Sequence, residues 1–272
     1  MIKPGEIQKI ASSLKVKDTQ IEKDYVLGWI LKGISQNNFL SRKLAFKGGT
    51  TIRKFYIANY RLSEDLDFTF TDMNMNATVI KSEFDHVLKW VALESRLTLV
   101  IRDEKIHNTG NYVFYIGYIG PLGGSINNKS IKVDICNDEK LCNATVDLSA
   151  LNEYSDLKDE YKINCYSIRE IIAEKMRSLM QRTMPRDLYD LWFLLEVEGY
   201  NILDFISDFQ EKARYKNLDP DMFVNTVISK EVRFKNTWNN YLTDQIKDLE
   251  DFDTVWRNLN KHFRIFDGYI NS

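Results

Sequence analysis

Two aspartates, Asp65 and Asp67, stand two residues apart in the segment "SEDLDFTF". The alternation of "LDFTF" predicts a β-strand. Residues two apart on a strand point to the same face, so both carboxylates can meet one cation. Carboxylate oxygens suit Mg²⁺, which usually takes one or two of them together with the phosphates of a substrate. The pair is therefore a candidate magnesium site; the alternative for a D-x-D pair on a strand is a solvated face.

A double glycine, Gly48 and Gly49, follows the apolar segment "KLAF" and precedes "TTIRKFYIA", which has helical spacing. Glycines let the backbone approach a ligand closely, and amides at a helix start favour an anion. No acidic residue occurs between Tyr25 and Ser63, and the same stretch holds the basic residues Lys32, Arg42, Lys43, Lys47, Arg53, Lys54 and Arg61. Such a segment can neutralise a triphosphate, with Lys47 and Lys54 as candidate contacts.

Two more charged residues lie far along the chain. Asp134 falls on the predicted strand "IKVDI", where its neighbours Val133 and Ile135 should face the opposite side. It is a candidate third metal ligand. Lys175 shares a helical stripe with Ile171 and Leu179. An unpaired ammonium is costly to bury, so Lys175 either extends to water or meets a phosphate or carboxylate.

The predicted elements that position these residues form an α+β arrangement. The first forty residues and 77–95 read as helices, and "RLTLVIR", "NYVFYIGYIG" and "SIKVDIC" read as strands. Helical patterns then dominate: "SIREIIAEKMRSLMQRT" is amphipathic, and Pro185 fits the first turn of a helix that Gly199 can close. We expect an α/β domain over 1–165 and a helical domain over 166–272 that contributes to the active site.

Composition limits the function classes. The 272 residues carry a net charge of −2, so nucleic-acid contacts must use local basic patches. One candidate patch is the helix with Arg169, Lys175, Arg177, Arg182 and Arg186; the alternative is a helix with ordinary solvated charges. Three cysteines without CxxC spacing argue against a disulfide framework or zinc site. No apolar run reaches membrane-spanning length, and we expect a cytoplasmic protein.

The order of these motifs resembles a known superfamily. A GG[ST] turn, a short helix, D-x-D and a later strand carboxylate resemble the nucleotidyltransferases of the DNA polymerase β type. More narrowly, "FKGGTTIRKFY" and "RLSEDLDF" look like the AbiEii/AbiGii toxin family of nucleotidyltransferases. Three further stretches agree: "IEKDYVLGWIL", "IREIIAEKMRSLMQR" and "RDLYDLWFLL". The resemblance spans roughly residues 20–196 and implies a mixed sheet with flanking helices, followed by a helical domain.

The resemblance also assigns roles. It places Gly48, Gly49 and Thr50 in the nucleotide-phosphate turn, and Ser63, Asp65 and Asp67 in the nucleotide and metal motif. It brings Lys175 to a phosphate and lets Asp187 or Asp190 complete the site. Asp134, Asp187 and Asp190 stay open as candidates for the base. Ser63 has an alternative as a turn residue, and Asp187 as a helix-start acid.

The reaction that the resemblance implies moves NMP from an NTP to an acceptor hydroxyl, with Mg²⁺ present and pyrophosphate released. The family context implies a bacterial toxin–antitoxin or phage-defence toxin, an RNA acceptor such as tRNA, and a cognate antitoxin. A protein acceptor is also open. Two alternatives remain: a module that binds a nucleotide or partner without catalysis, and a transferase that modifies small molecules such as antibiotics.

Overall fold

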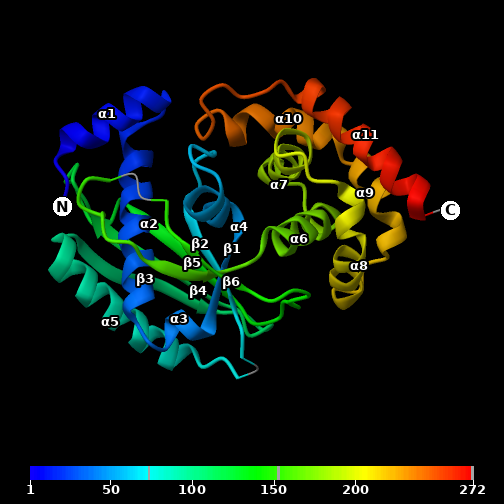
Figure 1. Cartoon of the computed structure of the whole chain (residues 1–272). Helices are drawn as coiled ribbons and strands as arrows, with labels where there is room; N and C mark the ends of the chain where they lie inside the picture. Colours follow the sequence, from blue (N-terminus) through cyan, green and yellow to red (C-terminus); the bar gives the residue numbers. More distant parts are fainter. Residues whose placement is uncertain (73, 152–153, 271–272) are drawn as a thin grey trace. The chain divides into compact units, whose positions relative to one another are not determined.

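We describe a computed structural model of the chain, which covers residues 1–72, 74–151 and 154–270. The chain divides into two compact units (Figure 1). The sheet unit comprises Met1–Glu139 and Thr145–Tyr166, and the helical unit comprises Lys140–Ala144 and Ser167–Ser272.

The sheet unit contains all seven strands of the described sheet. Its elements in chain order are α1 (Pro4–Leu14), α2 (Asp18–Gln36), α3 (Leu40–Lys43), β1 (Leu44–Lys47), α4 (Gly48–Thr51) with a π-helical turn (Ile52–Tyr56), β2 (Asp65–Phe70), α5 (Ala77–Ser95), β3 (Thr98–Ile106), β4 (Tyr112–Ile119), β5 (Ser130–Cys136), β6 (Val146–Ser149) and β7 (Lys162–Cys165). The expected strands over "LDFTF", "RLTLVIR", "NYVFYIGYIG" and "SIKVDIC" are all present as β2 to β5.

The strand order is β3-β4-β5-β2-β1-β7-β6. β2 pairs in parallel with β5 and β1 in parallel with β7, whereas the other neighbouring pairs are antiparallel. This mixed sheet confirms the α+β fold expected from the sequence. The sequence patterns did not predict β1, β6 or β7. Each has four residues, too few to show a clear period of two.

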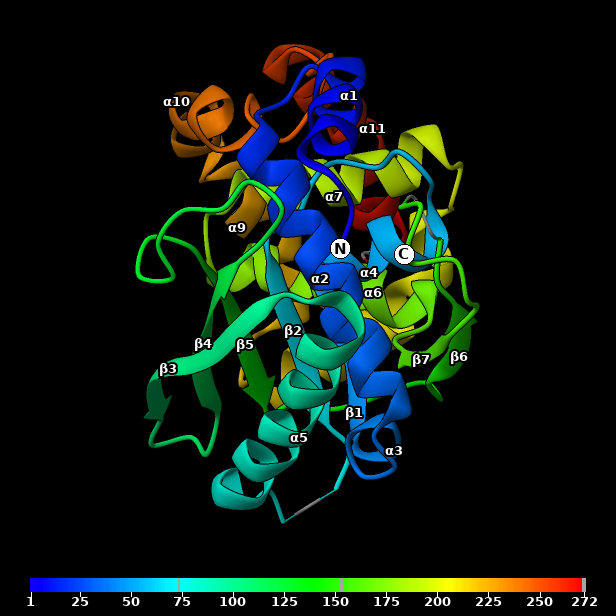
Figure 2. The same cartoon turned by 90° about the vertical axis from the view of Figure 1, so that its left-hand side faces the viewer.

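One face of the sheet is apolar and packs against helices of the same unit. Figure 2 shows α2 and α5 in front of the strands, and the two helices also contact each other. The inward residues alternate along the central strands and are buried: Leu44, Phe46, Leu66, Phe68, Phe114, Val133 and Ile135. Strand alternation then sends the intervening residues to the opposite face, and these include the predicted metal aspartates.

A buried ionic cluster fastens α2 to the π-helical turn. Asp24 lies 2.9 Å from Arg53 Nε and 2.5 Å from Lys54 Nζ, and Tyr154 donates to it at 2.6 Å. Burial alone would raise the pKa of Asp24, but the two neighbouring cations hold it well below its usual range. Asp24, one of the two acids in the "IEKDYVLGWIL" stretch, is therefore an internal counter-ion for two of the basic residues noted in the sequence.

The helical unit follows from residue 167. Its elements are α6 (Ile168–Gln181), α7 (Pro185–Trp192) with a π-helical turn (Phe193–Val197), a 3₁₀ turn (Ile202–Phe205), α8 (Ile206–Tyr215), a second 3₁₀ turn (Pro220–Met222), α9 (Phe223–Ile228), α10 (Glu231–Leu242) and α11 (Phe252–Ile270). Ser167 caps α6 by accepting from Glu170 N, and Pro185 opens α7 as expected. Gly199 follows the π-helical turn with φ +78°, a conformation that favours glycine. Across the described residues, no helix has both the length and the apolar character needed to cross a membrane.

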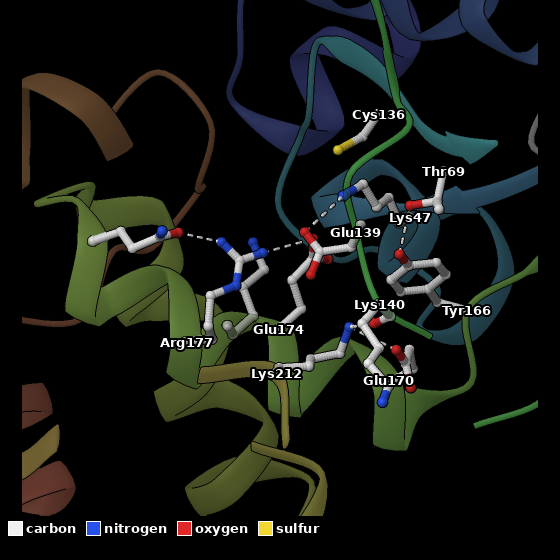
Figure 3. A network of polar contacts seen from close by, with 12 residues as sticks. Lys47, Thr69, Cys136, Glu139, Lys140, Tyr166, Glu170, Glu174, Arg177 and Lys212 are labelled. Atoms are coloured by element: carbon white, nitrogen blue, oxygen red, sulfur yellow. Dashed lines mark hydrogen bonds and ion pairs between the residues drawn. The ribbon is translucent and has the colours of Figure 1, made fainter. Parts of the chain in front are cut away.

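Residues 140–144 belong to the helical unit although they lie between β5 and β6 in sequence. Glu170 accepts hydrogen bonds from the amides of Cys142 and Asn143, at 3.1 and 3.0 Å. Lys212, which is fully buried, pairs with Glu170 at 2.7 Å and donates to the Lys140 carbonyl at 2.6 Å (Figure 3). This short segment is thus bound to α6 and α8 through its backbone.

Candidate active site

Three charged residues stand side by side on the three central strands. Lys47 on β1 pairs in register with Asp67 on β2, and Asp67 pairs in register with Asp134 on β5. Asp65, two residues before Asp67, is in register with Lys132. Alternation places all five side chains on the face away from the apolar core. The structure therefore brings Asp65, Asp67 and Asp134 together on one face of the sheet, from segments about 70 residues apart in the sequence.

The glycine turn lies directly against this row. Gly48 has φ +80°, and a Cβ at this position would stand 2.7 Å from Asp67 Oδ2. Any side chain here would both strain the backbone and press on the carboxylate. Thr50 is buried and its hydroxyl donates to the Asp65 carbonyl at 2.7 Å. The turn that the sequence assigned to phosphate binding is thus held at the start of the D-x-D strand.

Gly49 is crowded from the other side of the turn. A Cβ at Gly49 would meet the Arg61 guanidinium and would come within 3.3 Å of Ser63 Oγ. Arg61 and Ser63 are both largely buried. The structure therefore adds Arg61 to the residues beside the turn. The sequence made Arg61 one of several candidate sources of positive charge for the phosphate, but did not place it beside the turn; its position two residues before Ser63 was the available signal.

The electrostatics of the row centre on Asp67, which is half-buried. Burial and the charge of Asp65 raise its pKa to about 6, Asp134 acts in the same direction, and Lys47 and Lys132 oppose the rise. Lys132 Nζ lies 2.8 Å from Asp134 Oδ2. The pKa of Lys132 is raised: burial would lower it, but Asp134 and the two other acids outweigh that effect. Three carboxylates thus share only two nearby ammonium groups.

The raised pKa of Asp67 predicts that the stability of the chain depends on pH. The pKa of Asp67 is about 6 in the folded chain against an ordinary 3.8, so the folded state prefers the protonated acid. The protonated Asp67 side chain contributes fully to the free energy of unfolding below about pH 4, and this contribution is lost as the pH rises through 6. Asp67→Asn should therefore raise the free energy of unfolding by about 1–3 kcal/mol at pH 7.5 without metal, and by little at pH 4.

Urea unfolding of both proteins between pH 4 and 8 measures this difference. Glu64→Gln is the matched control, since Glu64 pairs with Lys23 at 3.0 Å instead of joining the acidic row. A stability difference between Asp67→Asn and the parent that does not grow with pH would contradict the assigned pKa.

Lys47 has further partners around the row. Its ammonium lies 4.0 Å from Glu139 Oε2 and 5.7 Å from the centre of the Tyr166 ring (Figure 3). The Tyr166 hydroxyl shares a 2.5 Å hydrogen bond with Thr69 Oγ1. Glu139, Tyr166 and Thr69 were not singled out from the sequence, because no local pattern connects them to Lys47. Glu139 and Tyr166 contact the lysine beside the carboxylates of the row, and Thr69 orients the Tyr166 ring.

A divalent cation fits the chemistry of this face. In the described part of the chain, no His, Cys, Asp or Glu side chains form a ready-made group of three or more metal ligands. Mg²⁺ needs only one or two carboxylates when substrate phosphates supply other ligands. Asp65 and Asp67 meet that requirement. The raised pKa of Asp67 reflects burial first and then repulsion from Asp65 and Asp134, and a bound cation would offset both effects. Asp134 is already engaged by Lys132.

Lys54, the other lysine assigned to phosphate, lies in the buried cluster of α2. Its ammonium pairs with Asp24, sits 5.4 Å from the centre of the Tyr154 ring, and is 4% exposed. The basic stretch before Ser63 is therefore shared between two tasks. Lys47 and Arg61 lie beside the glycine turn and the D-x-D strand, whereas Arg53 and Lys54 balance Asp24.

The predicted residues of the helical unit form a second cluster. Lys175 Nζ lies 2.8 Å from both Asp187 Oδ1 and Asp190 Oδ2, and all three residues are buried. Arg182 Nε lies 2.7 Å from Asp187 Oδ2. Burial would raise the pKa of Asp187, but Lys175 and Arg182 hold it below its ordinary value. Of the open possibilities for Lys175, the structure shows the carboxylate partner. The catalytic roles of Lys175, Asp187 and Asp190 stay predictions.

Comparisons with known proteins now define the class. A family model described as "Nucleotidyl transferase AbiEii toxin, Type IV TA system" matches residues 29–258. The fold resembles the crystal structure of JHP933 from Helicobacter pylori, with a TM-score of 0.60, 18% identity, and coverage of 94% of this chain and 95% of that one. It also resembles MenT4, a nucleotidyltransferase toxin from Mycobacterium tuberculosis, with a TM-score of 0.52, 14% identity, and coverage of 89% and 100%. A search of curated proteins gave no match.

The protein is a nucleotidyltransferase, as the family match and the fold together show. The chain belongs to the AbiEii toxin family of Type IV toxin–antitoxin systems, which confirms the resemblance drawn from "FKGGTTIRKFY" and "RLSEDLDF". Membership implies an NTP substrate and a cognate antitoxin. The match extends well beyond Glu196, where the sequence motifs had ended.

Proposed function

We propose that the chain is a Mg²⁺-dependent toxin that transfers NMP from an NTP to an RNA hydroxyl, with tRNA as the acceptor. The observation that carries the proposal is the in-register row of Lys47, Asp67 and Asp134, set against the Gly48 turn. On one face of the sheet, this row places carboxylate oxygens that can bind a metal beside a lysine ammonium group and the backbone of a glycine turn. The same proposal includes a cytoplasmic site of action and a role in phage defence.

In the proposed reaction, the acceptor oxygen forms a bond to the α-phosphorus of the NTP. The bond from that phosphorus to the bridging oxygen breaks, and pyrophosphate leaves with its electron pair. Asp65 and Asp67 hold Mg²⁺, which when bound stabilises negative charge on the phosphates. Lys47 and Arg61 supply positive charge beside the turn, while the backbone of Gly48 and Gly49 leaves room for the triphosphate.

The acceptor hydroxyl must also lose a proton. Within the sheet unit, Asp134 is a candidate base, and its hydrogen bond with Lys132 orients the carboxylate. Asp187 and Asp190 remain candidates in the helical unit, and Lys175 a candidate phosphate contact. We omit Lys54 from the proposed phosphate contacts because it is already paired with Asp24.

A label-transfer experiment tests the acceptor. The protein is incubated with Mg²⁺ and each of the four NTPs, labelled at the α-phosphate, together with purified bulk tRNA. We expect one NTP to label tRNA, and EDTA to abolish the labelling. Parallel reactions contain total cellular protein or a panel of hydroxylated small molecules. If protein or a small molecule becomes labelled while tRNA does not, that acceptor class replaces RNA in the proposed function.

A further inference from the structure

Four of the five cations of the candidate RNA surface suggested by the sequence are neutralised within the helical unit. The basic residues of α6 and its C-terminal flank pair with carboxylates: Arg169 with Asp208, Lys175 with Asp187 and Asp190, Arg177 with Glu174, and Arg182 with Asp187. Cations already held by nearby acids contribute little to binding a polyanion. An RNA acceptor therefore needs a different basic surface, since the net charge of the chain is only −2.

The last helix offers such a surface. On α11, Arg257, Lys261 and Arg264 are exposed and recur at helical spacing, so they lie along one side of the helix. The opposite side is buried, through Phe252, Val255, Leu259, Phe263 and Phe266. Packing of that apolar side holds the helix in place and keeps the three cations directed outward. We call these three residues the α11 stripe; α11 is the orange to red helix in Figure 1.

The stripe borders a hollow with few acids. A hollow of about 360 Å³ opens along α11 and is lined by Asp253, Trp256, Arg257, Asn260, Lys261 and Arg264. The one acid of this lining, Asp253, accepts from Lys235 at 2.7 and 2.8 Å, which offsets its charge. Asn260 can donate or accept a hydrogen bond. The lining is thus suited to an anion that carries several oxygen acceptors.

The two arginines of the stripe are available for a ligand. Neither Arg257 nor Arg264 has an ion pair or hydrogen bond within the described residues, whereas Lys261 only donates to Asn258 at 3.3 Å. Guanidinium groups bind phosphate oxygens in a forked geometry. From Arg257 to Arg264 the helix rises by about 10 Å, at about 1.5 Å per residue. An RNA strand that runs along the stripe can therefore bring more than one of its phosphates within reach of these cations.

We propose that the α11 stripe binds the phosphate backbone of the RNA acceptor. This inference rests on the proposed function, because it names the surface that holds the acceptor. Two of its three residues, Lys261 and Arg264, lie beyond the segment that the family model matches. Most of the stripe therefore lies in a part of the chain outside the matched family region.

The test removes the three charges in the full-length protein, as R257Q/K261Q/R264Q. The matched control is R214Q/R233Q/K247Q, which removes two arginines and one lysine at other exposed positions of the helical unit. Binding of bulk tRNA is measured by fluorescence anisotropy without NTP, at several salt concentrations. For the stripe variant we expect a Kd roughly 10- to 100-fold higher at low salt, and a slope of log K against log salt smaller by about 2.

Each other outcome counts against the proposal. If the stripe variant and the matched control bind tRNA alike, or if the parent protein binds no tRNA, the assignment is wrong. Binding of polyglutamate, which represents an acidic protein, is measured in parallel. The assignment is also wrong if the stripe variant loses affinity for polyglutamate but keeps its affinity for tRNA. Pyrophosphate release from NTP at saturating tRNA, measured in separate reactions, reports the transferase activity independently of tRNA affinity. The surface proposal can therefore fail while nucleotidyl transfer is intact.

Discussion

Asp65→Asn is expected to reduce pyrophosphate release from NTP, in the presence of Mg²⁺ and bulk tRNA, by about 10²–10³-fold or more. The substitution removes the charge of one of the two carboxylates that would hold the metal. Asp67 and Asp134, which lie in register on β2 and β5, keep their charges. The side chain keeps its shape, so the sheet should stay intact. Pyrophosphate release measured over a range of Mg²⁺ concentrations checks the prediction.

Glu64→Gln is the matched control for this experiment. Glu64 precedes Asp65 in sequence, but it pairs with Lys23 and takes no part in the acidic row. We expect it to keep at least half of the parent activity. Thermal unfolding of both variants separates loss of catalysis from loss of fold. Full activity of a folded Asp65→Asn protein would remove the metal from the proposed mechanism.

Asp24→Asn is expected to destabilise the sheet unit by about 3–5 kcal/mol. The change leaves Arg53 and Lys54, which are 1% and 4% exposed, without the carboxylate that lies 2.9 and 2.5 Å away. Removing one partner of a buried ionic group costs far more than removing a surface pair, because the remaining charges stay desolvated. Urea unfolding of the full chain at pH 7 measures the difference.

Asp72→Asn supplies the comparison. Asp72 pairs with Lys43 at 2.7 Å, but both side chains are well exposed, so the loss should stay within about 1 kcal/mol. The effect of Asp24→Asn should be the same at pH 5 and pH 7. The pKa of Asp24 lies well below its ordinary value of 3.8, so its stabilising contribution is complete above about pH 4 to 5 and is lost as the pH falls further. Equal losses in the two variants would show that Asp24 is not the counter-ion of this cluster.

Most of the sheet and the centre of the site could be predicted from local patterns. Local patterns in "LDFTF" and "SIKVDIC" predicted β2 and β5, and with them the common face of Asp65 and Asp67. The pairing of β2 with β5, which brings Asp134 to that face, comes from the structure. Lys132 was within reach of the same reasoning, since it lies two residues before Asp134. The four-residue strands β1, β6 and β7 were not, because so short a run shows no periodicity.

The division of the basic stretch could not be predicted. Arg53 and Lys54 looked like phosphate ligands on charge alone, and only the packing of α2 shows that they face Asp24, about 30 residues earlier. Arg61 likewise reaches Gly49 through a tertiary contact. Pairings between distant segments depend on the full arrangement of elements. Charge patterning therefore identified the right segment but did not assign each cation its partner.

The segment 140–144 has a consequence for synthesis on the ribosome. Its backbone is held by Glu170 and Lys212, and Lys212 follows Lys140 by 72 residues. At about 5–20 residues per second, the ribosome needs roughly 4–14 s to make that interval. During this lag the connection between β5 and β6 emerges before the helix that secures it. A messenger cut before the codon for Lys212 would thus yield a chain that contains β5 and Asp134. In that chain, the segment after β5 would lack the hydrogen bond from Lys212 to the Lys140 carbonyl.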